Sequence, residues 1–272
     1  MKAQEGINAA SQLILDYHVS LGDSVDGYVL APPNGSGTFV KFSVFNKTMF
    51  GILTAAHIAR RLKITIKDMA QFVGISKPHL QHTLRCLTPF HFIYCNADIR
   101  HFHSKLNDSY WPDIAFIALG NDSFCPKHEI FTKSKFYDLD ANTEFGYTED
   151  MNIFTTFFRG ACNDDEITKE GLLAELCLGG GETIHFDNET KIHYWRIPNF
   201  SKKTIAGASG AGFWRHKIVT DNLRTSLEGV ITAESPLHDY IDAISPSYLY
   251  DTFLPNLKKY SSAFLNEQVN KP

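Results

Sequence analysis

The stretch IAGASGAGFW, residues 205–214, is a turn of small residues around one serine that leads directly into an apolar segment. The glycines at 207 and 210 permit a tight turn without side-chain clash, so neighbouring backbone N–H groups can converge on one point. Such groups stabilise the oxyanion that forms when a nucleophile attacks a carbonyl carbon. Ser209 is therefore the candidate nucleophile, with the N–H groups of Gly207 and Ser209 as oxyanion donors. The alternatives are an ordinary glycine-rich turn and a phosphate-binding loop, which is disfavoured because no Gly-Lys-Ser/Thr follows.

Two other segments supply groups that would activate this serine. In GILTAAHIARR, residues 51–61, an apolar strand ends in two alanines and a histidine, and in WPDIAFIALG, residues 111–120, one carboxylate opens an apolar strand. A carboxylate placed against a core needs a partner. We therefore predict His57 as the base that takes the serine proton and Asp113 as the group that orients it. Taken singly, each has a structural alternative: a satisfied strand-end histidine for His57 and a strand or turn cap for Asp113.

Three short blocks together carry a family resemblance. TAAH at 54–57, DIA at 113–115 and GASGAG at 207–212 resemble, in the same order, the signature blocks of the trypsin-like (chymotrypsin-fold) serine proteases. The resemblance extends from about Gly27 to Tyr250. It implies an all-β fold of two antiparallel six-stranded β-barrels with the active site between them. It also implies hydrolysis of peptide bonds through an acyl-enzyme, with neither a cofactor nor a metal.

Three positions depart from the pattern of the secreted family members. Ala208 stands where those members have an aspartate that pairs with a newly cut amino terminus, and Ile58 stands where they have a disulfide cysteine. Ala211 replaces the usual second glycine after the serine. The chain is thus similar to intracellular bacterial members, including relatives of the HtrA type, and activation by cleavage of a pro-segment is not expected.

The resemblance also implies a substrate-binding segment. LEGVITAES, residues 227–235, is similar to the strand that pairs with substrate backbone beside the primary specificity pocket. Thr232, Ala233 and Glu234 would then lie along one wall, with Glu234 at a position that is usually glycine. A side chain there would narrow the pocket or meet a basic group, which favours small or basic substrate residues. Lys203, in an alternative interpretation, lines the pocket floor and reverses that preference. The expected partner is a protein or peptide substrate.

The chain-wide pattern agrees with an all-β fold. Short β-branched and aromatic runs broken by Pro, Gly, Asn and Asp begin near Gly27, and a hydrophobic fraction of 43% in 272 residues is sufficient to fill the cores. Apolar residues at three- and four-residue spacing predict a helix over 5–19 and a closing helix over 246–266. We expect an N-terminal helix in 1–22, a first β-barrel lobe in 23–122, a second in 123–245, and a C-terminal helix and tail in 246–272.

Composition limits the partners and the compartment. The 26 basic and 30 acidic residues give a net charge of −4, so no field of one sign attracts the whole protein to nucleic acid or anionic lipid. The five cysteines have no close pair, which favours reduced thiols over a disulfide framework or a zinc ribbon. A secretion signal and an apolar run of about 18 residues are both missing, so a cytoplasmic protein without membrane contact is predicted. A cytoplasmic protease needs control, and a regulatory protein partner is a further expectation.

Three alternatives stay open at this point. Residues 67–87 resemble a helix-turn-helix, which would indicate a helical insertion and a DNA-binding regulator. His101 and His103 flank Phe102 and would share one face of a strand as metal ligands, although no third ligand is evident. A protease-like fold without activity would bind peptides by strand addition.

Overall fold

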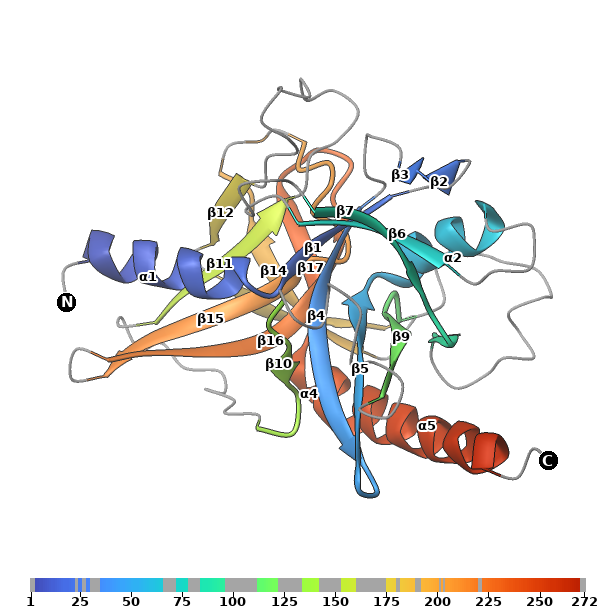
Figure 1. The fold of residues 1–272 in the computed structure, drawn as a ribbon. Coiled ribbons are helices and arrows are strands. Elements are labelled where there is room, and N and C mark those ends of the chain that lie inside the picture. The colour runs from blue at the N-terminus through green and yellow to red at the C-terminus, as the bar shows by residue number, and fades with distance from the viewer. Residues whose placement is uncertain are drawn as a thin grey trace.

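The structure, a computed structural model, places the described strands in two main, largely antiparallel sheets, with helices near both ends of the chain (Figure 1). It describes residues 3–22, 24–25, 28–29, 35–65, 72–77, 84–95, 112–121, 134–141, 153–159, 175–179, 182–188, 192–200, 202, 204–219 and 222–269. The mostly β fold class that the sequence predicts is confirmed.

The first sheet has eight strands in the order β7-β6-β1-β4-β5-β9-β8, with β10 paired in parallel to β4. Their bounds are β1 (His18–Gly22), β4 (Gly35–Val44), β5 (Lys47–Thr54), β6 (Phe72–Lys77), β7 (Leu84–Pro89), β8 (Phe92–Tyr94), β9 (Ala115–Asn121) and β10 (Tyr137–Asp138). The β4–β5 hairpin closes at Phe45 and Asn46, and Phe45 has φ of 53°, the conformation that two-residue hairpin turns require. Strands β2 (Ser24–Val25) and β3 (Tyr28–Val29) form a separate small ribbon.

The second sheet has seven strands in the order β12-β11-β15-β16-β17-β14-β13. Their bounds are β11 (Ile153–Arg159), β12 (Glu175–Gly179), β13 (Thr183–Asp187), β14 (Ile192–Pro198), β15 (Gly212–Val219), β16 (Asn222–Glu234) and β17 (Tyr240–Ile244). The prediction of two six-stranded barrels is therefore too specific. Within the described ranges the sheets have eight and seven strands, and no strand pairing closes either sheet into a barrel.

The helix-turn-helix prediction for residues 67–87 is wrong where the structure describes this segment. Residues 72–77 and 84–87 lie in the antiparallel strands β6 and β7, and β6 also pairs with β1. Because β6 has a neighbouring strand on each side, its backbone groups are satisfied in the sheet, and this tertiary pairing overrides the local helical pattern. Residues 67–71 and 78–83 lie outside the described residues.

The N-terminal helix ends earlier than the predicted range of 5–19. Helix α1 (Ala3–Leu15) buries Ala10 and Ile14 and contacts β15 and β16. Figure 1 shows it lying along β15. The chain leaves the helix because β1 begins at His18 and pairs with both β4 and β6, burying every residue of that strand.

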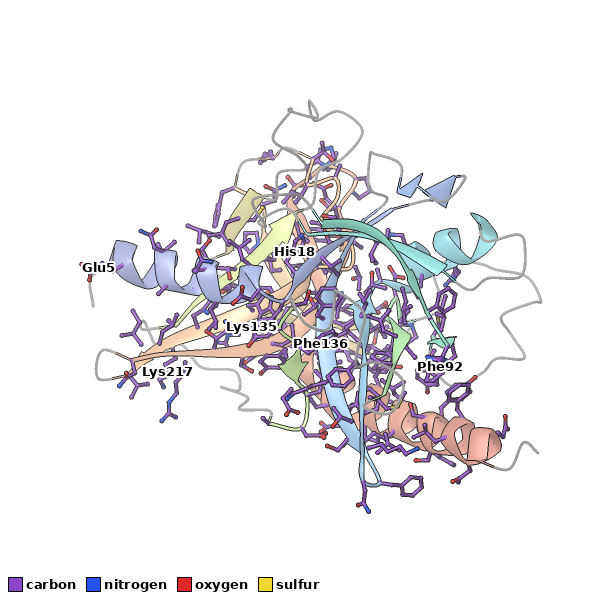
Figure 2. The ribbon with its side chains drawn as sticks, in the orientation of Figure 1. Glu5, His18, Phe92, Lys135, Phe136 and Lys217 are labelled. Atoms are coloured by element: carbon purple, nitrogen blue, oxygen red, sulfur yellow. The ribbon has the colours of Figure 1, made fainter. Side chains whose placement is uncertain are left out.

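The closing helix confirms the predicted range of 246–266 and extends it. It consists of α4 (Pro246–Tyr248), a π-helical turn η2 (Leu249–Phe253) and α5 (Leu254–Val269). Pro246 occupies the first helical position, where an N–H group would have no partner inside the helix. Phe92 of β8 packs on α5, with its ring centroid 5.1 Å from Tyr260 and 4.9 Å from Phe264 (Figure 2).

Buried apolar side chains form three clusters that hold the sheets and helices together. One lies between the first sheet and α2 (Ala56–Thr65), a second within the second sheet, and the largest joins both sheets to α1 and α5. Phe136 packs between Phe39 and Phe50 of the first sheet, with ring centroids 5.0 and 5.1 Å away (Figure 2). The loops that carry the predicted site residues therefore start from rigid, buried strands.

Two findings concern membrane and redox chemistry. Over the described ranges, no helix has both the length and the apolar character needed to cross a bilayer. Cys95 and Cys177, whose side chains the structure describes, are not in disulfides.

Candidate active site

The pairing of two strands brings His57 and Asp113 together. His57 lies in the first turn of α2, three residues after the end of β5, and Asp113 lies two residues before β9. In the β5–β9 register Thr54 is opposite Ala115, so the chain segments beyond these two ends leave the sheet side by side. His57 N donates a hydrogen bond to Asp113 Oδ1 over 2.8 Å, and His57 Nδ1 lies 2.6 Å from Asp113 Oδ2.

This double contact fixes which nitrogen of the histidine carries a proton. An ionised carboxylate only accepts hydrogen bonds, so Nδ1 donates to Asp113 and the lone pair is left on Nε2. The two side chains are 32% and 26% exposed, so the pair is shielded but His57 still reaches solvent. A lone pair on Nε2 in a partly exposed side chain is what a general base requires.

The turn that carries Ser209 packs against the strand that leads to His57. Gly207 and Gly210 have φ of 85° and 88°, a region that favours glycine. A Cβ atom on Gly210 would collide with Ser36 O and Thr54 Oγ1 and would lie 3.0 Å from Ala55 N. Gly210 is thus pressed onto the end of β5, and the residue beside it, Ser209, is brought to the part of the fold that holds His57.

Ser36 of β4 is a site residue that sequence reasoning missed. Its N–H donates to Ser209 O over 2.8 Å, and its hydroxyl donates to Gly207 O over 2.6 Å. Ser36 O in turn accepts a hydrogen bond from Thr54 Oγ1 over 2.7 Å. The first sheet therefore holds the serine turn of the second sheet through one residue. The one signal in the sequence is that Ser36 lies between two glycines in GSGT, residues 35–38. Glycines in a strand often mark a place where another backbone segment comes close.

These contacts leave the predicted oxyanion donors available. The carbonyl groups of Gly207 and Ser209 accept hydrogen bonds from Ser36, while the N–H groups of Ala208 and Gly210 donate to Ile205 O and Ile231 O. For the N–H groups of Gly207 and Ser209, the described residues offer no acceptor within hydrogen-bonding distance. The Gly207–Ala208 and Ser209–Gly210 peptide groups are therefore held by hydrogen bonds, and the Ser209 N–H between them can donate to a substrate oxygen.

Ser209 and His57 are not joined directly. Among the residues with described positions, no hydrogen bond links Ser209 Oγ to the imidazole of His57. Such bonds are often long without substrate and shorten when it binds. The structure thus brings His57 and Asp113 into contact and places the Ser209 turn against the same strand end.

The residues predicted for substrate binding have different environments. Strand β16 runs beside the serine turn, because Gly210 N donates to Ile231 O and Ile231 N donates to Ala211 O, each over 2.8 Å. Thr232 Oγ1 donates to Asp242 O over 3.1 Å inside the second sheet. Ala233 is exposed, and the carboxylate of Glu234 turns toward the loop before Ser209. Lys203 lies outside the described residues.

The metal alternative gains no support from the described part of the chain. There, no group of three His, Cys, Asp or Glu side chains is arranged to hold a metal ion. His101 and His103 lie outside the described residues.

Solved structures share this fold at low sequence identity. The structure is similar to the scabies mite inactivated protease paralogue S-I1, with a TM-score of 0.50 and 12% identity over 91% of this chain and 96% of that chain. The chain has a chymotrypsin-like fold. It is also similar to the MamO protease domain from Magnetospirillum magneticum (TM-score 0.46, 12% identity, 88% of this chain and 96% of that chain). Human heparin binding protein gives a TM-score of 0.49 and 9% identity over 87% and 89% of the two chains.

Sequence comparison alone does not find these relationships. No model of a protein family matches the chain, and no curated protein matches it significantly. At identities of 9–12% the similarity concerns the fold, and the assignment of a function depends on the site.

Proposed function

We propose that this chain is a serine endopeptidase in which Ser209 is the nucleophile, His57 the general base and Asp113 the group that orients His57. The observation that carries the proposal is the double contact of Asp113, which accepts hydrogen bonds from both the backbone N–H and the ring Nδ1 of His57. A carboxylate that served only as a turn cap would need the backbone contact alone. The contact to Nδ1 adds the tautomer control that a general base needs.

The proposed reaction follows from these positions. Ser209 Oγ attacks the carbonyl carbon of a peptide bond while His57 Nε2 takes the hydroxyl proton, and the N–H groups of Gly207 and Ser209 stabilise the negative oxygen. His57 then gives that proton to the departing amine, which leaves an ester on Ser209. Water, activated by His57, hydrolyses the ester and restores the hydroxyl group.

The substrate in this proposal is a protein or peptide that lies along the exposed end of β16. Ala233 is exposed there, two residues after Ile231, whose backbone bonds to the serine turn, and strand addition would bring a peptide to this segment. Four parts of this proposal rest on sequence alone. They are a cytoplasmic location, an intracellular bacterial type, a regulatory protein partner, and a division into two lobes near residue 122.

The second candidate function is a protease-like module that binds peptides without cleaving them. It is favoured by one observation, that in the described residues Ser209 Oγ forms no hydrogen bond with His57. The mite protein of similar fold is itself described as an inactivated protease paralogue, so this fold does not require activity.

A fluorophosphonate probe distinguishes the two functions, because it forms a bond only with an activated serine. We expect wild-type protein to be labelled on Ser209, with fluoride as the leaving group, and Ser209→Ala to remain unlabelled. His57→Ala should slow labelling on the order of 10⁴-fold, since the proton acceptor is lost. Ser43→Ala, an exposed serine on β4, is the control and should react like wild type. A folded wild-type protein that binds peptides but resists the probe would favour the binding module.

A further inference from the structure

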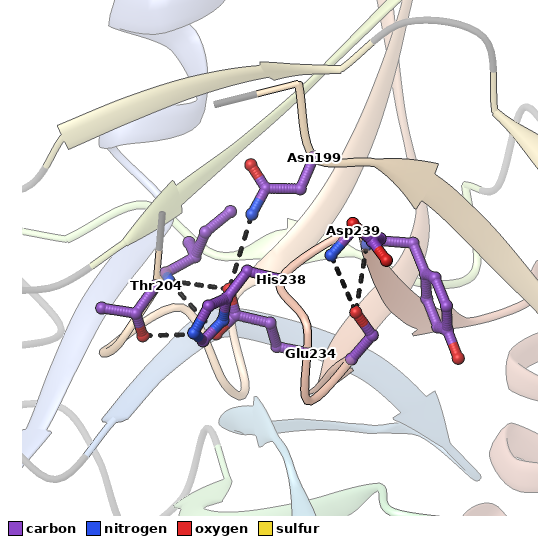
Figure 3. Close-up of polar contacts among 8 residues, drawn as sticks. Asn199, Thr204, Glu234, His238 and Asp239 are labelled. Atoms are coloured by element: carbon purple, nitrogen blue, oxygen red, sulfur yellow. Dashed lines mark hydrogen bonds and ion pairs between the residues drawn. The ribbon is translucent and has the colours of Figure 1, made fainter. Parts of the chain in front are cut away.

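The carboxylate of Glu234 is surrounded by donors from the loop that precedes Ser209 (Figure 3). The backbone N–H of Ile205 donates to both of its oxygens, over 3.1 and 3.2 Å. The Thr204 hydroxyl donates to Oε2 over 3.3 Å, and the Asn199 side-chain amide donates to Oε1 over 3.5 Å. His238 Nδ1 lies 3.0 Å from Oε1. The side chain is only 21% exposed, so these contacts form in a largely shielded position.

Glu234 is bonded to one end of a six-residue segment, residues 205–210, which contains Ser209 and which we call the arc. The arc runs from Ile205 to Gly210, and its far end is held on β16 by the backbone pairing of Gly210 with Ile231. Its near end is held by the Glu234 carboxylate, three residues further along the same strand. The two attachment points are about 10 Å apart along β16, whereas six residues can extend to roughly 18 Å. The arc is therefore not extended between them: Ala208 N donates to Ile205 O over 3.1 Å, and this turn contains Gly207 and directly precedes Ser209.

We propose that Glu234 is a positioning residue that fixes the near end of this arc, and so sets the direction of the Gly207 N–H, rather than a residue that recognises a basic substrate group. This inference rests on the proposed function, because it assigns a role in the same site. Gly207 is only two residues from Ile205. If Ile205 N loses its hydrogen bonds to Glu234, we expect the Gly207 N–H to change direction, because one residue separates the two. Ser209 has two further anchors, because Ser36 and Ile231 hold the peptide group that follows it.

The contacts argue against recognition of a basic substrate side chain. Both carboxylate oxygens already accept hydrogen bonds from the protein, and the imidazole of His238 lies against one of them. A substrate cation would have to displace Ile205, Thr204 or His238 to bind. The backbone N–H of Ile205 would then lose its acceptor in a largely shielded position, which is costly. These contacts therefore favour a structural role of Glu234 within the site over the preference for small or basic residues that the sequence predicts.

The same two loops contain a matched control. Asp239 lies in the loop after β16, and its carboxylate is 3.5 Å from Lys202 Nζ in the loop before Ser209. These side chains are 44% and 73% exposed, and the Asn199 N–H bonds the backbone oxygen of Asp239 rather than its carboxylate. Asp239→Ala therefore removes one carboxylate between the loops without touching the arc.

The test uses two diphenyl phosphonate probes, one with an aminobutyl and one with a methyl side chain, so that the affinity KI and the rate of bond formation kinact are separated. In Glu234→Ala we expect kinact to fall on the order of 10²-fold for both probes, with KI nearly unchanged, because misplacement of the donor slows the chemistry. Glu234→Gln retains one oxygen acceptor for Ile205 and should recover part of the rate. Asp239→Ala should equal wild type. Amide hydrogen exchange of segment 204–211 should accelerate in Glu234→Ala.

The possible outcomes separate this proposal from the proposed function. A higher KI for the aminobutyl probe alone, with kinact intact, would show that Glu234 recognises basic groups and would overturn the positioning role. Equal kinact in wild type and Glu234→Ala would also overturn it, whatever the hydrogen exchange shows. A wild-type protein that reacts neither with these probes nor with the fluorophosphonate would refute the peptidase itself, and the role of Glu234 would fall with it.

Discussion

Replacement of Asp113 by asparagine tests the orientation of His57 with almost no change in shape. In the wild type, Asp113 Oδ1 accepts from the backbone N–H of His57 over 2.8 Å, and Oδ2 lies 2.6 Å from the ring Nδ1. An amide has one oxygen and one NH₂ group, so it cannot accept both hydrogen bonds. If its oxygen keeps the backbone N–H, its NH₂ group faces Nδ1, which must then become the acceptor. The ring proton moves to Nε2, and the base has no lone pair for Ser209.

The expected magnitude follows from this loss of the correct tautomer. We expect fluorophosphonate labelling of Asp113→Asn to be slower on the order of 10⁴-fold. That factor corresponds to about 5 kcal/mol in the activation free energy. The opposite amide orientation would set its NH₂ group against the backbone N–H of His57. Two donors would then face each other and the backbone hydrogen bond would be lost, so this orientation is also unfavourable. The rate is measured at fixed probe concentration, and folding is checked by urea unfolding of each variant.

Asp140→Asn is a matched control for this experiment. Asp140 also accepts a backbone N–H, that of Ser43 over 2.6 Å, and a cationic group, Lys258 Nζ over 2.5 Å. Because it joins β4 to α5 and carries no proposed site group, its variant should be labelled at the wild-type rate. Labelling of Asp113→Asn at the wild-type rate, in a protein that unfolds at the same urea concentration, would refute the assignment of Asp113 and His57.

Two further predictions concern the stability of the fold. Gly210→Ala should lower the free energy of unfolding by about 2 kcal/mol or more and slow probe labelling, because φ of 88° disfavours alanine and the new Cβ would collide with Ser36 O; unchanged urea unfolding and labelling would contradict the packing described. Burial lowers the pKa of His216 from 6.5 to about 3. The unfolded chain therefore binds this proton more readily, so stability is fully present above pH 6.5 and falls by up to about 5 kcal/mol as the pH drops toward 3. His216→Gln should flatten this part of the pH profile in chemical unfolding, and an equally steep profile would show that other groups cause it.

The sequence predicts the chemical groups of the site and the general class of the fold. His57, Asp113 and Ser209 are recognisable because each stands in a short motif at a strand end, and the motifs occur in the order of a known family. The closing helix is equally clear, since apolar residues repeat at helical spacing and Pro246 marks its start. Local patterns of this kind depend only on residues that are near one another in the chain, and a single sequence contains all the information they need.

Long-range contacts explain where the sequence was misleading or silent. The segment 67–87 has a local helical pattern, but pairing with β1 and β7 makes the described part of it strand. The neighbours of Glu234 in sequence do not reveal that Ile205 and Thr204 donate hydrogen bonds to it. Its predicted preference for small or basic substrate residues stays a prediction. The N-terminal helix ends at Leu15 and not at the predicted residue 19, because residues from His18 onward pair with β4 as strand β1.

The amino-acid sequence by itself determined which side chains are the candidates for the proposed acyl transfer and predicted that strands would carry them. Only the tertiary structure decided that Asp113 contacts His57 twice, that Ser36 bonds to the serine turn, and that the Glu234 carboxylate accepts hydrogen bonds from Ile205 N. The physical reason is that these hydrogen bonds join groups far apart in the chain, and their geometry depends on strand register and on how the two sheets pack. A shift of one residue in the β5–β9 register would separate His57 from Asp113 without changing any motif.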